Sequence, residues 1–114
     1  MDRVEEYKGI IRRIISDYAR WKPSYGEVIV EAICTDEAGH YELIYSGWHE
    51  HRRIHGTVIH IDVRDGKVWV QHDGTEDGVT DELTRAGIPR EEIVVGFLSP
   101  EERKLTPYAA LREA

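Results

Sequence analysis

This chain has 114 residues and a formal net charge of −7, so it is long enough for one hydrophobic core but lacks the basic excess of a stand-alone duplex-DNA binder. Its composition, 40% hydrophobic and 32% charged, excludes a disordered chain, and no apolar run approaches the roughly 18 residues that span a membrane. The single cysteine, Cys34, excludes an internal disulfide, and the start, MDRVEEYKG, lacks the apolar centre of a secretory signal. We expect a single cytoplasmic domain, residues 1–114, with no cofactor.

The first predicted element is a helix from Asp2 to about Arg20. Its apolar residues recur at the spacing of one helix face: Val4, Tyr7, Ile10, Ile11, Ile14, Ile15 and Tyr18. Pro23 and Gly26 interrupt the pattern and end the helix.

Four strands are predicted next. EVIVEAICT (27–35) and HYELIYSGW (40–48) flank the turn residues DEAG, which indicates a hairpin. RIHGTVIHIDV (53–63) and KVWVQH (67–72) flank Asp65-Gly66, a pair typical of a two-residue type I′ turn. These connections favour an antiparallel meander.

The remaining elements are short. A second helix is predicted from about Gly74 to Ala86, with Asp73 and Glu76 spaced as a capping box. EIVVGF (92–97) is predicted to be a fifth strand, and SPEE (99–102) predicts a short helix capped by Ser99. The fold class is therefore α+β, with the helices on one face of the sheet.

Counting outward from Asp65-Gly66 predicts which side chains share a face. Ile61 opposes Val70, His60 opposes Gln71 and Ile59 opposes His72. Ile59, Ile61 and Val70 share one face. The opposite face then collects five residues that form the best-defined polar group in the chain: His60, Asp62, Trp69, Gln71 and Asp73.

Several roles fit this predicted face. It is either the solvated side of the sheet, a surface for a partner, or the site of a metal-assisted hydrolase or nuclease that uses His60, Asp62 and Asp73. Asp73 to Gly78 also matches the start of a calcium loop, but the twelfth position holds Thr84 where such loops need glutamate. Helix capping explains those acids better.

A second candidate surface surrounds HEHRRIH (49–55), which we expect to be a loop. Trp48 precedes it and is positioned to contact Arg52 or Arg53 through a cation–π interaction. Direct DNA binding through this segment and Arg12/Arg13 is an alternative, which the net charge disfavours. An exposed Trp69 or a free edge strand would support a dimer.

Four blocks of the sequence resemble the XisI family, the fdxN-element excision controlling factors found mainly in cyanobacteria. They are PSYGE, HYELIYSGW, RRIHGTVIHIDVRDGKVWVQHDGTEDG and ELTRAGIPREEIVVGFLSP. The resemblance runs from the first helix to about Arg103 and is most specific from Arg52 to Gly78. It implies an accessory role in DNA rearrangement beside a companion protein, XisH, and it offers no established catalytic residues to carry over to this sequence. We expect a non-catalytic regulatory factor whose interaction surface comprises Trp48, Arg52, Arg53, His60, Asp62, Trp69, Gln71 and Asp73.

Overall fold

The computed structural model describes residues 2–24 and 26–110. In chain order the elements are α1 (Arg3–Tyr18), β1 (Glu27–Thr35), β2 (His40–His49), β3 (Arg52–Arg64), β4 (Lys67–Asp73), α2 (Val79–Arg85), the 3-10 turn η1 (Arg90–Glu92), β5 (Ile93–Val95) and α3 (Pro100–Arg103). None of the helices in this part of the chain is long and apolar enough to cross a membrane.

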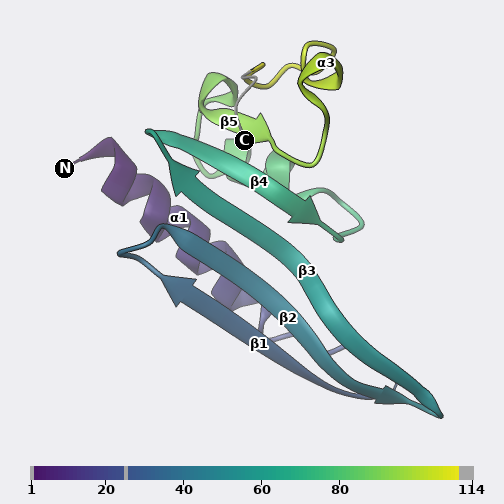
Figure 1. The fold of residues 1–114 in the computed structure, drawn as a ribbon. Helices are drawn as coiled ribbons and strands as arrows, with labels where there is room; N and C mark the ends of the chain where they lie inside the picture. The colour runs from purple at the N-terminus through teal and green to yellow at the C-terminus, as the bar shows by residue number, and fades with distance from the viewer. Residues whose placement is uncertain (1, 25, 111–114) are drawn as a thin grey trace.

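The five strands form one sheet in the order β1-β2-β3-β4-β5 (Figure 1). The first four make the predicted antiparallel meander, and β5 pairs in parallel with β4. The chain reaches a parallel position because α2 lies between β4 and β5 and carries it back along the sheet. The α+β fold class is confirmed, and the sheet is mixed.

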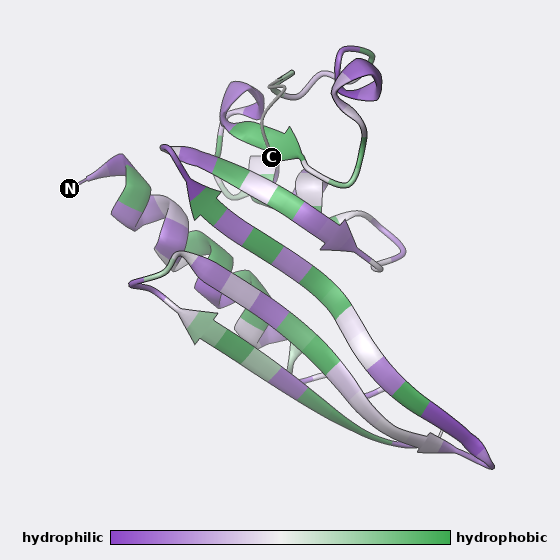
Figure 2. Cartoon of the chain, in the orientation of Figure 1, coloured by the Kyte–Doolittle hydropathy of each residue, from purple (hydrophilic) through white to green (hydrophobic). Residues whose placement is uncertain are grey.

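The helices α1 and α2 pack on the same face of the sheet, which we call the inner face. Asp2 caps α1 by accepting a hydrogen bond from the Val4 amide. The core between helices and strands consists of Tyr7, Ile11, Ile14, Ile15, Tyr41, Leu43, Ile59, Ile61, Val68, Val70, Val79, Leu83, Ile88 and Ile93. Figure 2 shows the alternation of apolar and polar residues along β3 that places one set inward.

Turn chemistry fixes the β3–β4 hairpin. Asp65 and Gly66 both have positive φ, 52° and 76°, as a type I′ turn requires, and Arg64 opposes Lys67. The predicted pairing is correct as far as Ile61 opposite Val70.

Beyond Val70 the predicted pairing is wrong, because β4 contains a bulge. His60 opposes His72 and Ile59 opposes Asp73, which leaves Gln71 as the extra residue. Counting from a turn assumes one residue per rung, and a single bulge shifts every later rung. Asp73 is consequently opposite core residue Ile59, on the inner face, and does not share a face with His60 and Asp62.

Asp73 instead holds the segment that leads into α2. Its carboxylate accepts hydrogen bonds from the Thr75 amide at 3.0 Å and the Val79 amide at 2.8 Å. The helix therefore begins at Val79, later than predicted, and the expected capping box between Asp73 and Glu76 does not form. The box predicted at the other end of the chain does form, between Ser99 and Glu102.

The segment HEHRRIH is not the loop that we expected. β2 continues to His49 and β3 starts at Arg52, so only Glu50 and His51 make the turn. Glu50 has a positive φ of 56°. Figure 1 shows this hairpin reaching past the end of α1, and we call its outer part, residues 46–55, the hairpin tip.

Candidate functional site

The structure separates the predicted surface into four places. His60, Asp62 and Gln71 lie together on the outer face of the sheet, which is the face away from α1. Asp73 lies on the inner face at the start of α2. The combination of His60, Asp62 and Asp73 that a hydrolase would use therefore does not converge.

Trp69 lies on the outer face but is not available to a partner. Only 2% of it is exposed, because the guanidinium groups of Arg64 and Arg103 each lie 5.4 Å from its ring centroid. Arg103 belongs to α3, so the C-terminal segment covers the outer face at this end of the sheet, and the expected placement of the helices on one face holds for α1 and α2 but not for α3. The prediction of an exposed Trp69 that supports a dimer is wrong.

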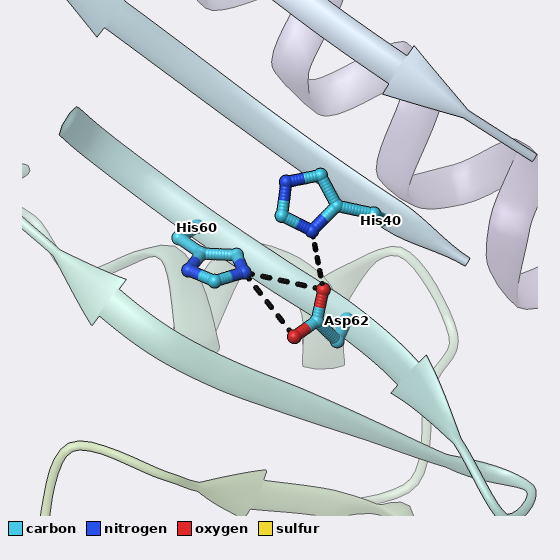
Figure 3. Close-up of side chains that lie close together, drawn as sticks. All are labelled: His40, His60 and Asp62. Carbon is cyan, nitrogen blue, oxygen red and sulfur yellow. Dashed lines mark hydrogen bonds and ion pairs between the residues drawn. The ribbon is translucent and has the colours of Figure 1, made fainter. Parts of the chain in front are cut away.

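The outer face brings in one residue that the sequence did not single out, His40 of β2. Its Nδ1 lies 2.8 Å from Oδ1 of Asp62, and Nε2 of His60 lies 3.2 Å from the same oxygen (Figure 3). The two imidazole rings meet edge to face with centroids 4.6 Å apart. We call His40, His60 and Asp62 the histidine–aspartate cluster.

A second carboxylate supports the cluster from β2. Nε2 of His40 lies 3.0 Å from Oε1 of Glu42, and the Thr57 hydroxyl donates to the other oxygen of Glu42. The hydrogen bond from Thr57 is the main cause that lowers the pKa of Glu42, and the bond to His40 lowers it further. Burial has the opposite effect but is outweighed. Burial alone would lower the pKa of His40, but the bonds to Glu42 and Asp62 outweigh it and raise that pKa above its ordinary value.

Asp62 is held on its other oxygen as well. Oδ2 lies 3.4 Å from the Gln71 amide nitrogen and 3.5 Å from an Arg64 guanidinium nitrogen. His60 Nε2 lies 3.2 Å from this oxygen as well, so it contacts both oxygens of Asp62, whereas His40 contacts Oδ1 (Figure 3). Two imidazoles and a carboxylate with converging atoms can hold either a proton or a divalent metal ion.

His40 was not predicted because residues 49–55 were expected to be a loop, so the pairing of β2 with β3 was not counted. A count from the Glu50-His51 turn would in any case place His40 opposite Ile61, on the inner face. A bulge between Leu43 and Ile44 shifts the pairing, so that His40 opposes Asp62 and Glu42 opposes His60. The polar residues that alternate in HYE (40–42) are the one local signal of a polar face there.

The hairpin tip carries the remaining predicted residues. Trp48 is 52% exposed, and the Arg53 guanidinium lies 5.4 Å from its ring centroid, as the cation–π prediction required. A groove of about 1020 Å³ runs beside them, lined among others by Lys22, Ile29 and Glu50. Arg52 is exposed next to this pair.

Comparison with known proteins places the chain among relatives. The model of the XisI protein family matches residues 1–110. The chain belongs to the XisI family. No protein among the curated ones matches it.

Two solved XisI-family structures have the same fold. One is the crystal structure of a XisI-like protein from Anabaena variabilis ATCC 29413, at 35% identity and a TM-score of 0.86, covering 93% of this chain and 97% of that one. The other is the crystal structure of the fdxN element excision controlling factor XisI from the same organism, at 28% identity and a TM-score of 0.83, covering 96% and 100%. The XisI fold therefore extends over nearly the whole of all three chains.

Proposed function

We propose that this XisI-family chain is a non-catalytic accessory factor in the control of DNA-element excision, and that it acts by binding a XisH-like protein through the hairpin tip. A role in this process is supported by the similarity to the structure of an fdxN element excision controlling factor. The choice of the hairpin tip as the binding surface rests on Trp48. This side chain is half exposed, has Arg53 against its ring, and lies on a hairpin that extends beyond the core.

The chemistry of the tip suits a protein partner. Tryptophan and arginine are the residue types that most often dominate the binding energy of protein interfaces. Ile29, which is 68% exposed on β1, adds apolar surface to the groove beside Trp48. Stacking of Arg53 on Trp48 restricts both side chains before binding, and this lowers the entropy cost of ordering them in a complex.

The charge distribution disfavours direct DNA binding as the main activity. The net charge is −7, and the phosphate backbone is bound through a surplus of cationic groups. Arg12 of α1, one of the residues considered for DNA contact, forms an ion pair with Asp36 at 2.9 Å. The hairpin tip itself combines Arg52 and Arg53 with Glu50.

The direct experiment is a quantitative pull-down of this chain with a XisH-like protein. We expect Trp48→Ala combined with Arg53→Ala to weaken the complex by about 30-fold or more, the loss typical of a central aromatic–arginine pair. Phe97→Ala is the matched control, because Phe97 is also aromatic and also 52% exposed but lies between β5 and α3.

The outcomes separate two claims. If the wild-type chain does not bind the XisH-like protein, the partner is wrong. If the wild type binds and the double variant binds as tightly as Phe97→Ala, the partner stands and the hairpin tip is the wrong surface.

A further inference from the structure

Both ring nitrogens of His40 face carboxylate oxygens. Nδ1 is 2.8 Å from Asp62 and Nε2 is 3.0 Å from Glu42. A neutral imidazole has one N–H donor and one lone pair. In the neutral ring, one of these two contacts would therefore set a nitrogen lone pair against a carboxylate oxygen, which is repulsive.

A positive charge between His40 and one of the carboxylates removes this repulsion. The charge is either a second proton on the imidazole or a metal ion. The surroundings distinguish the two nitrogens: Nε2 meets Glu42, whereas Nδ1 faces a point where His60 Nε2 also converges on Asp62 Oδ1. We propose that the histidine–aspartate cluster binds a divalent transition-metal ion of the zinc type, with His40 Nδ1, His60 Nε2 and Asp62 Oδ1 as its ligands.

The distances suit such an ion. Zinc bonds of 2.0–2.1 Å in a tetrahedron place neighbouring ligand atoms about 3.3 Å apart. The Asp62 oxygen lies 3.2 Å from the His60 nitrogen and 2.8 Å from the His40 nitrogen, and the cluster's ligand atoms all fall within 4.8 Å of one another. A move of His40 Nδ1 away from Asp62 Oδ1 by roughly 0.5 Å would bring this pair of atoms to the same spacing.

The outer contacts of the ligands are those expected around a bound metal ion. Metal-bound histidines usually donate their second N–H to a carboxylate, and Glu42 is placed to accept it from His40. Thr57 in turn holds Glu42. Gln71 and Arg64 contact Oδ2 of Asp62 and so hold the carboxylate in place between the two histidines.

The cluster also joins two strands. His40 comes from β2, whereas His60 and Asp62 come from β3, so a bound ion would cross-link the two strands at the end of the hairpin opposite its turn.

The ligand types indicate which metal ions fit. Nitrogen-rich ligand sets favour zinc, copper or nickel over magnesium and calcium, which prefer oxygen ligands. Part of each ligand is exposed, 16% of the side chain in the case of Asp62, so an ion and a fourth ligand from solvent can reach the cluster.

The test is calorimetric titration of the full chain with Zn²⁺ after treatment with a chelator. We expect one ion per chain, an increase in the thermal midpoint with Zn²⁺, and a loss of affinity of about 100-fold or more in His40→Gln and in Asp62→Asn. Glu42→Gln should weaken binding by roughly 10- to 100-fold, as for other residues that orient a metal-bound histidine. His55→Gln, the same change at an exposed residue nearer the start of β3, should leave the affinity unchanged.

Nitrogen-15 NMR of the wild-type histidines supplies a readout that needs no variant. Zn²⁺ should shift Nδ1 of His40 and Nε2 of His60. The proposal is overturned if no stoichiometric binding occurs, which would leave a proton as the only occupant. It is also overturned if the shifts appear at His49, His51 and His55 instead, or if His55→Gln lowers the affinity as much as His40→Gln does.

Discussion

Replacement of Arg103 by alanine tests how the C-terminal segment is held to the sheet. Arg103 is 3% exposed, its Nε donates to the carbonyls of Val95 at 3.2 Å and Leu98 at 3.0 Å, and its guanidinium lies over Trp69. Its contact with the Gly96 carbonyl is weaker, at 3.4 Å. The side chain thus joins the β5–α3 connection to the outer face of β4.

The magnitude follows from these contacts. A hydrogen bond from a charged donor is worth about 1.5–3 kcal/mol net, and two bonds that share one N–H count as little more than one. A desolvated cation–π contact adds up to about 2 kcal/mol. We therefore expect Arg103→Ala to lower the free energy of unfolding by about 3–4 kcal/mol, since it removes the bonds to the Val95 and Leu98 carbonyls and opens Trp69 to water.

Urea denaturation measures this loss. With a slope near 2 kcal/mol per molar, the midpoint should fall by roughly 1.5–2 M. Trp69 fluorescence, read in a Trp21→Phe, Trp48→Phe background, should shift to longer wavelength in the native state. Arg103→Lys is the matched variant: it keeps the charge but not the planar fork, so it should recover less than half of the loss.

Two results would refute this reasoning. One is a loss below about 1 kcal/mol for Arg103→Ala, the range of ordinary surface changes. The other is a lysine variant as stable as the wild type, which would show that the charge alone matters.

Two further predictions concern the inner cap and the outer cluster. Asp73→Ala should lower the free energy of unfolding by about 1–2 kcal/mol, because the Thr75 and Val79 amides lose their acceptor. Thermal unfolding measures the loss, with Asp77→Ala as the control. An effect no larger than that of Asp77→Ala would contradict the capping role of Asp73. In chelator, the raised pKa of His40 contributes stability that is fully present below pH 6.5 and is lost as the pH rises through its folded-state pKa. The lowered pKa of Glu42 contributes stability that is present above pH 4.5 and is lost as the pH falls through its folded-state pKa. We therefore compare the unfolding free energy of the wild type with that of a His40→Gln, Glu42→Gln variant. The difference between the two should be largest between about pH 4.5 and 6.5. A gap that does not change from pH 3 to 9 would rule out this coupling.

Local chemistry made several features predictable from the sequence. The periodicity of α1, the Asp65-Gly66 turn and the Ser99 cap each depend on residues within a few positions of one another, and the structure has all three. Polar alternation in β3 likewise predicted that His60 and Asp62 share a face. The family resemblance, carried by the blocks around them, is confirmed over residues 1–110.

The composition of the site was decided by tertiary structure. Bulges at two strand pairs moved Asp73 to the inner face and brought His40 opposite Asp62, and neither bulge has a signal as local as a turn dipeptide. The burial of Trp69 depends on Arg103, which is 34 positions away in the chain. The sequence by itself thus determined the elements and their polar faces. The long-range pairing of the strands and the packing of the C-terminal segment decided which polar side chains meet, because one extra residue in a strand reverses the face of every side chain beyond it.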